Sequence, residues 1–342
     1  MKRRLAMLLT VAITAVSVMA CGGNTNTNQT SSDSGTSTSQ SAKGAGGDYK
    51  IDVILKTLSS EYWQYVKAGA DAAAADLGVT VDIKGPSSET AYDEMQNMIE
   101  TDITSGGYDA MVIAPLQSDT VTTLVAGTKT PIFAVDTDFD APEKISFIGT
   151  GNEEAGYEGT QAAYKAAVDA GWKDVKCIEI AGVQGDNTNT ARMNGYKKGI
   201  NDAGGEFLED EVQYADAVAD KAVTAMEAIM QTHPEGIAVI CANNDDMAMA
   251  AARAAKGNKA YEKTIFLGFD GNRAACESIL AGEETMSVIQ DAYGMGYKAV
   301  ETAVAHLKGE KVDEFVSKFE NSGVVDKSNA QERLDKLDSY LK

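Results

Sequence analysis

Several short apolar runs of this chain end in side chains that form hydrogen bonds in more than one direction. Lys56 follows the run 51–55, and Asp136 follows the run 131–135. Carboxylates combined with Arg or amide groups form charge-assisted networks around hydroxyls, which donate and accept hydrogen bonds together. An aromatic ring adds a flat apolar face against which C–H groups can lie. The residues with these properties are Lys56, Tyr62, Trp63, Asp136, Arg192, Asn244, Asp270 and Gln290.

Strand-like runs and amphipathic stretches alternate along the chain and must position these residues. We predict strands at 51–55, 79–83, 110–114, 131–135, 175–180, 206–212, 237–242 and 265–268. We predict helices at 60–77, 89–105, 155–170, 190–203, 221–231 and 246–255, because apolar residues recur there at helical spacing. Strict alternation of this kind is typical of α/β folds with parallel sheets and helices on both faces.

The alternating pattern restarts after about Thr150, which indicates two similar, Rossmann-like lobes. In open α/β sheets, ligands bind beyond the carboxyl ends of the strands. Each strand end that we can place delivers a residue suited to hydroxyl recognition. The second lobe contributes Arg192 at the end of a polar loop that follows 175–180.

Three segments resemble the pentose and hexose binders of the type I periplasmic-binding-protein family. They are Lys56–Ser59 with Trp63, Cys241–Met249 and Gly268–Gly271, and the similarity runs from about Tyr49 to Lys311. The resemblance implies two lobes joined by a three-strand hinge. The chain should cross that hinge near Thr150, near Gln290 and around 317–321. The lobes should comprise 48–150 with 291–317, and 151–290 with 318–342.

The resemblance also assigns the ligand-binding roles. Asp136, Arg192, Asn244, Asp270 and Gln290 match hydrogen-bonding positions of the family. Lys56 matches a lysine of the allose-type members, and Tyr62 and Trp63 match the aromatic pair that begins the first helix.

Other positions depart from the family. Ala217 stands where relatives place an aromatic residue, Ser60 and Glu61 replace an Asn-Pro pair, and Thr137 replaces Arg or Glu. The identity of the sugar therefore stays open.

The first residues have the pattern of a secretory signal. Three basic residues at positions 2–4 precede an apolar run over 5–18, which is short for a membrane-spanning helix. Ala20 then precedes Cys21, as in the bacterial lipobox, so we expect a signal peptide over 1–20 and a lipidated Cys21. The segment 21–47 is rich in Ser, Thr, Asn and Gly and reads as a flexible linker that joins the anchor to the folded body.

Composition argues against several other classes of protein. The formal net charge of −21 disfavours nucleic acid and anionic lipid surfaces as partners. The acidic stretch from Asp136 lacks the Gly and Glu of a calcium loop, and Gly149–Gly151 lacks the third glycine of a dinucleotide loop. We therefore expect no metal and no cofactor. Cys177, Cys241 and Cys276 have neither metal-ligand spacing nor a disulfide pattern, and buried free thiols are expected.

The resemblance implies an extracytoplasmic lipoprotein that captures a monosaccharide and delivers it to the permease and ATPase of an ABC importer. We expect a monomer without enzymatic activity, anchored to the outer face of the cytoplasmic membrane, at a cell surface or in a periplasm. A sugar receptor for chemotaxis or a sensor kinase is the main alternative. A sugar-responsive repressor would need an N-terminal helix-turn-helix where the signal lies. A glycosidase would need two carboxylates flanking the scissile bond, such as Asp136 and Asp270.

Overall fold

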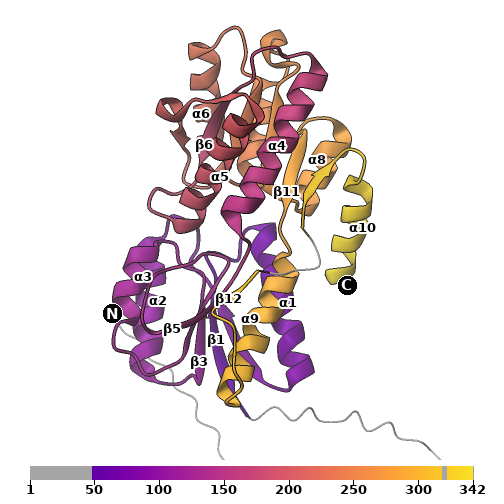
Figure 1. Ribbon diagram of the computed structural model, residues 1–342. Helices are drawn as coiled ribbons and strands as arrows, with labels where there is room; N and C mark the ends of the chain where they lie inside the picture. Colours follow the sequence, from indigo (N-terminus) through magenta and orange to yellow (C-terminus); the bar gives the residue numbers. More distant parts are fainter. Residues whose placement is uncertain (1–47, 318–321, 342) are drawn as a thin grey trace, which may run out of the picture. The chain divides into compact units, whose positions relative to one another are not determined.

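Two β-sheets with helices on both faces form the body of the protein (Figure 1). The computed structural model describes residues 48–317 and 322–341. The first sheet is parallel throughout. Its strands in spatial order are β12 (Phe315–Val316), β5 (Lys144–Ile148), β4 (Ile132–Val135), β3 (Ala110–Ile113), β1 (Lys50–Ile54) and β2 (Thr80–Lys84).

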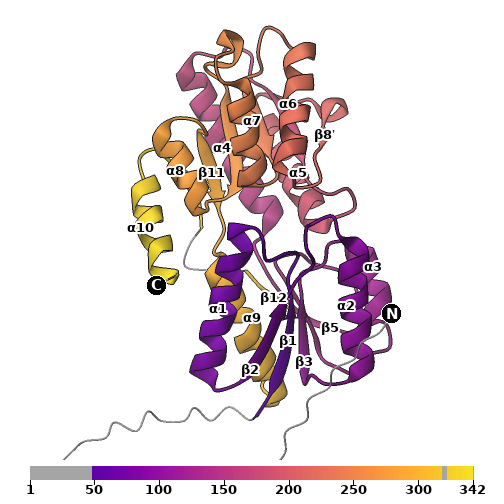
Figure 2. The ribbon, with the colours of Figure 1, turned by 180° about the vertical axis from the view of Figure 1, so that it is seen from behind.

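Alternating apolar residues give this sheet two buried faces. Ile51 and Val53 of β1 lie in one core cluster and Ile54 lies in another, because successive strand side chains point to opposite faces. Figure 2 shows the helices of the two faces on either side of the sheet. They are α1 (Glu61–Leu77) and α9 (Ala292–Leu307) on the first face, and α2 (Tyr92–Ser105) and α3 (Ser118–Val125) on the second.

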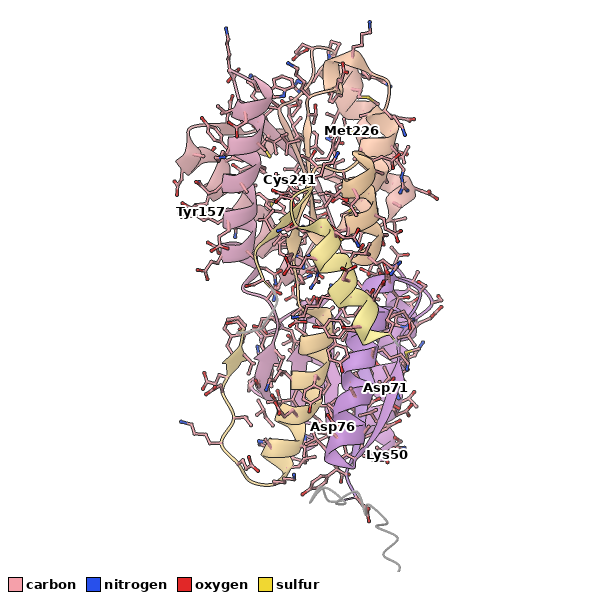
Figure 3. The ribbon with its side chains drawn as sticks, turned by 90° about the vertical axis from the view of Figure 1, so that its right-hand side faces the viewer. Lys50, Asp71, Asp76, Tyr157, Met226 and Cys241 are labelled. Carbon is pink, nitrogen blue, oxygen red and sulfur yellow. The ribbon has the colours of Figure 1, made fainter. Side chains whose placement is uncertain are left out.

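Glycines bring α1 and α9 unusually close together (Figure 3). A Cβ atom on Gly69 would lie 1.9 Å from the carbonyl oxygen of Tyr293, and one on Gly296 would lie 1.9 Å from that of Val66. Neither position can therefore hold a larger residue without a shift of one helix. The close packing holds the start of α1, where Tyr62 and Trp63 lie, against the rest of the first core.

The second sheet is parallel except at one edge, where β11 and β13 are antiparallel. Its strands in spatial order are β13 (Val324–Asp326), β11 (Met286–Ile289), β10 (Ile265–Asp270), β9 (Val239–Ala242), β6 (Lys176–Ala181) and β7 (Glu206–Phe207), and β8 (Gln213–Tyr214) also pairs with β6. Helices α4 (Asn152–Ala170) and α5 (Asn187–Ala203) share a core with one face, and α6 (Ala219–Thr232) and α7 (Asp245–Ala255) with the other. Helix α8 (Arg273–Ala281) packs beside the C-terminal helix α10 (Ala330–Tyr340).

The predicted fold class, two α/β lobes with parallel sheets, is confirmed. The chain passes from the first sheet to the second after β5, returns through α9 after β11, and passes over again between β12 and β13. No helix in the ranges 48–317 and 322–341 is long and apolar enough to cross a membrane.

Two predicted local features are wrong. The predicted strand 206–212 is interrupted, because a 3-10 helix at Glu209–Glu211 separates β7 from β8. The polar loop predicted before Arg192 is helical from Asn187, because the Asp186 side chain accepts a hydrogen bond from the backbone N–H of Asn189, 2.9 Å away, and caps α5. Arg192 therefore lies in the second turn of a helix.

Candidate functional site

Strand ends of both sheets surround one enclosed space with a volume of about 50 Å³. In the first sheet, β1 and β4 end shortly before Lys56 and Asp136. In the second sheet, β10 ends at Asp270, and β9 and β11 end shortly before Asn244 and Gln290. The fold thus brings together side chains that are more than 200 positions apart in the sequence. All the side chains predicted to bind ligand line this space, namely Lys56, Tyr62, Trp63, Asp136, Arg192, Asn244, Asp270 and Gln290.

The two aromatic residues at the start of α1 lie edge to face, with ring centroids 5.0 Å apart. The Tyr62 hydroxyl donates to Asp136 Oδ1 at 2.5 Å, and the Trp63 indole N–H donates to Glu89 Oε1 at 2.9 Å. Both rings are buried and both belong to the first core cluster as well as to the lining of the space. Each ring is therefore held by core contacts on one side and by a carboxylate in the site.

Arg192, in α5, lines the space on the side of the second sheet. Its Nε donates to Asn152 Oδ1 at 2.9 Å, and its Nη1 donates to the backbone carbonyl of Asn243 at 2.5 Å. The guanidinium carbon is 3.7 Å from the centroid of the Phe269 ring, a cation–π arrangement. The guanidinium is thus fixed in position while it faces the enclosed space.

Two further side chains of the second sheet are tied to their neighbours. Gln290 Nε2 donates to Asp270 Oδ1 at 2.7 Å, which fixes the orientation of that carboxylate. Asn244 caps α7, because its Oδ1 accepts from the backbone N–H of Met247 at 2.9 Å. These contacts hold the site in place before any ligand is present.

Strained backbone gathers at the same place. The non-glycine residues with positive φ in the described chain are Asp136 (64°), Asp216 (50°), Ala217 (59°) and Asp270 (130°). Asp136, Ala217 and Asp270 line the enclosed space. Such conformations cost about 1–3 kcal/mol each and cluster at functional sites. Strain and lining thus identify the same site independently.

An ion pair closes the site from one sheet to the other. Lys56 Nζ lies 2.5 Å from Asp186 Oδ2, and both side chains are buried. Burial acts to lower the pKa of Lys56, but the neighbouring Asp186, Asp136 and Glu89 raise it above its usual value. Lys56 is therefore fully charged at neutral pH.

Sequence reasoning missed some of the lining. Glu89 precedes α2 and holds Trp63, and Asp186 holds Lys56. Aspartate is a favoured N-cap residue, and its place between an apolar run and a predicted helix could have identified Asp186. Glu89 carries no comparable signal, because its position depends on how the loop before α2 folds.

The positions that depart from the family lie in different surroundings. Ser60 and Ala217 line the space. Glu61 instead accepts a hydrogen bond at 3.1 Å from the backbone N–H of Ala274 in α8. The Thr137 hydroxyl contacts Asp136 Oδ2 at 2.8 Å and Thr188 Oγ1 at 2.9 Å, so it supports the site from outside the lining.

In the part of the chain that the structure describes, neither the cysteines nor the acidic residues form a metal centre. Cys177, Cys241 and Cys276 are buried free thiols, as expected, and the Cys177 and Cys241 sulfurs are 3.3 Å apart. Within the described ranges, no group of three or more His, Cys, Asp or Glu side chains could hold a metal ion. Cys21, the predicted lipidation site, lies outside the described residues.

A larger space of about 590 Å³ lies near the amino ends of β10 and β11, lined in part by Lys256, Tyr261, Thr264 and Glu284. Among the described strands of the second sheet, only the antiparallel edge strand β13 ends there, at Asp326, and the parallel strands have their carboxyl ends at the opposite edge. We therefore assign the functional site to the smaller space between the sheets.

Two parallel sheets that close on a buried polar site are the arrangement of a two-lobed binding protein. The chain belongs to the periplasmic binding protein domain family, whose model matches residues 51–311. It is 31% identical over 271 residues to the D-allose-binding periplasmic protein of Escherichia coli K12, covering 76% of this chain and 85% of that protein. It is 27% identical over 276 residues to the ribose import binding protein of Bacillus subtilis, covering 79% of this chain and 85% of that protein.

Solved structures show the same architecture. A carbohydrate transporter solute-binding protein from Agrobacterium radiobacter, in complex with D-arabinose, superposes with a TM-score of 0.76 at 27% identity. The match covers 86% of this chain and 99% of that chain. The family model, the related sequences and the solved structures therefore agree on the family and the fold.

Proposed function

We propose that this protein captures a monosaccharide between its two lobes and delivers it to an ABC importer. The observation that carries the proposal is the enclosed space lined by an aromatic pair and by charged and amide groups from the strand ends of both sheets. Such a lining suits a ligand with many hydroxyls and a weakly apolar ring face. The named ligands of similar proteins, allose, ribose and arabinose, are all monosaccharides.

Capture requires the lobes to separate and close. Lys56 and Asp186 join the two halves, and so do the hydroxyls of Thr137 and Thr188, which are 2.9 Å apart. The space has a volume of only about 50 Å³, so these contacts would have to open for a sugar to enter. Hinge closure around the ligand would then form them again and produce the shape that a permease recognises.

We assign the direct ligand contacts to the eight residues predicted from the sequence. Asp136, Asp270 and Gln290 would bind hydroxyls through their oxygens and amide group, and Arg192 would donate from its fixed guanidinium. Trp63 and Tyr62 would cover the ring face. Lys56 and Asn244 would complete the contacts from opposite lobes.

The lobe boundaries proposed from the sequence are 48–150 with 291–317, and 151–290 with 318–342. Sheet membership supports them, since β12 belongs to the first sheet and β13 to the second. The body would act as a monomer, which size-exclusion chromatography with light scattering tests directly.

We further propose that Cys21 carries a lipid anchor and that the partners are a permease and an ATPase on separate chains. Members of this family are extracytoplasmic, and the basic and apolar residues before Cys21 support export of this chain. Labelled fatty acid should be incorporated into the native protein and not into Cys21→Ser. Membrane association of the Cys21→Ser variant equal to the native level would contradict the anchor.

Calorimetric titration of the body from residue 48 tests the proposed function. The panel is ribose, allose, arabinose, galactose, xylose, glucose and myo-inositol. One-to-one binding of one member, with the sugar recovered unchanged, is the expected result. Silence across this panel and across the amino sugars of the next section, from a protein shown to be folded by circular dichroism, would contradict monosaccharide capture.

A further inference from the structure

The lining of the enclosed space contains more acidic than basic side chains. Its acidic members are Glu89, Asp136, Asp186, Asp246 and Asp270, and its basic members are Lys56 and Arg192. A neutral sugar brings no charge to offset this excess. The charge balance of the site therefore depends on which carboxylates are paired with a cation of the protein.

Only one carboxylate of the lining forms an ion pair among the described residues. That pair joins Asp186 to Lys56 at 2.5 Å. Arg192, the other cation, donates its hydrogen bonds to Asn152 Oδ1 and to the backbone carbonyl of Asn243, and it forms no ion pair within the described chain. The positive charges of the site are thus either already paired or held away from a direct carboxylate contact.

The remaining four carboxylates have neutral donors or none. Asp136 accepts hydrogen bonds from Tyr62 at 2.5 Å and from Thr137 at 2.8 Å. Asp270 accepts one from Gln290 at 2.7 Å, and Glu89 accepts one from Trp63 at 2.9 Å. Asp246 has neither a hydrogen bond nor an ion pair in the part of the chain that the structure describes, and it is half-buried. Asp270 is more than nine-tenths buried, and only one of its two oxygens accepts a hydrogen bond from a described residue.

Closing a site on unpaired carboxylates is unfavourable, because a buried charge without a partner loses its hydration. Burial correspondingly raises the pKa of Glu89, Asp246 and Asp270. Either protons or a cation must offset the negative charge when the lobes close. An ammonium group on the ligand would offset the charge, because it has three hydrogen-bond donors and a full positive charge. A hydroxyl has one donor and no charge.

We propose that the ligand of this site is an amino sugar or another amino-substituted polyol, whose ammonium group binds among Asp246, Glu89, Asp136 and Asp270. The inference rests on the proposed function, since it concerns the same site and the same closure. It narrows the ligand class from any monosaccharide to those that carry a positive charge. The hydroxyl groups of such a ligand would still accept hydrogen bonds from Arg192, and its ring face would still pack on the aromatic pair.

Matched ligands test this inference by calorimetry at pH 7. Glucose, galactose and mannose are each compared with the 2-amino sugar of the same configuration and with its N-acetyl form, beside the neutral panel. A charged hydrogen bond is worth about 1.5–3 kcal/mol, so the amine should bind about 10- to 100-fold more tightly than its hydroxyl or N-acetyl counterpart. N-acetylation keeps the nitrogen and removes the charge, so it isolates the contribution of the charge.

Three results distinguish this inference from the proposed function. Tight binding of an amine with its neutral counterparts much weaker supports both. If a neutral sugar binds and the 2-amino sugar of the same configuration binds no more tightly, the inference is overturned and monosaccharide capture stays intact. The same holds if a neutral sugar binds at least as tightly as every amino sugar. Silence for amines and neutral sugars alike overturns both.

Variants locate the ammonium group. Asp246→Asn and Glu89→Gln keep the shape of the side chain and remove its charge, and each should reduce the preference for the amine by about tenfold. Asp210→Asn removes an exposed charge from the same lobe as Asp246 and should leave the preference unchanged. A preference that survives in Asp246→Asn, in Glu89→Gln and in the double variant would contradict this placement.

Discussion

The ion pair between Lys56 and Asp186 should control closure of the lobes, and Asp186→Asn tests it. The amide oxygen that this substitution introduces would still accept the hydrogen bond from Asn189 N–H that caps α5, so the helix should keep its start. What the substitution removes is the charge that faces Lys56. Since the two residues come from different lobes, the pair forms only when the lobes meet.

The magnitude follows from burial. The side chains of Lys56 and Asp186 are only 9% and 4% exposed in the closed form. Removing one partner of a buried, hydrogen-bonded charge pair typically costs about 2–5 kcal/mol, largely because the other charge stays buried alone. In the open form Lys56 can return to water, so the loss should fall on closure. We therefore expect the affinity for the ligand to drop by roughly 30- to 3,000-fold.

Calorimetry gives the affinity, and thermal melting without ligand gives the stability of the fold. The matched control is Asp71→Asn, which breaks the exposed pair between Lys67 and Asp71, also 2.5 Å long, on the outer side of α1 (Figure 3). An exposed pair is worth about 0–1 kcal/mol, so this variant should bind like the native protein. Native affinity in Asp186→Asn would refute the reasoning. A large loss of unliganded stability in that variant would make the pair part of the fold and contradict its role in closure.

Further substitutions test the packing, the pH dependence and the site. Gly69→Ala should lower the free energy of unfolding by about 1–3 kcal/mol in urea titrations, because its Cβ would lie 1.9 Å from the Tyr293 carbonyl; native stability would contradict the close packing of α1 and α9. Burial raises the pKa of Glu179 from 4.5 to about 8, so its contribution to stability is present below pH 4.5 and is lost as pH rises to about 8. Glu179→Gln should therefore flatten the fall in melting temperature over that range, and an unchanged pH profile would contradict the assignment. Trp63→Ala should weaken ligand binding at least tenfold while circular dichroism stays native, because it removes the ring that we propose covers the ligand and leaves Glu89 without its donor. Undiminished affinity would exclude Trp63 from the site.

The alternation of strands and helices was predictable because local pattern determines it. A run such as β3 is apolar throughout, and helices such as α1 have an apolar face, so each is recognisable without knowledge of its neighbours. The short strands were not predictable in this way. β12 has two residues and pairs with β5, more than 160 positions earlier, so tertiary contacts alone define it.

The site was predictable to the extent that it follows strand ends. Asp136 and Asp270 directly follow buried strands or end them, so the rule for parallel sheets places them together. Glu89 lies in a loop, and its approach to Trp63 depends on the path of that loop. The pairing of Lys56 with Asp186 was also beyond the sequence, because it depends on how closely two lobes meet.

The most direct test of sugar capture between the lobes uses Trp63 as a reporter. The chain has two tryptophans, and Trp172 lies away from the site with its indole N–H donating to the carbonyl of Lys263. The variant Trp172→Phe therefore leaves Trp63 as the only source of tryptophan emission. We predict a saturable change in this emission on titration with the sugar identified by calorimetry, with the same dissociation constant. Binding by calorimetry without any change in Trp63 emission would place the ligand elsewhere and contradict the account.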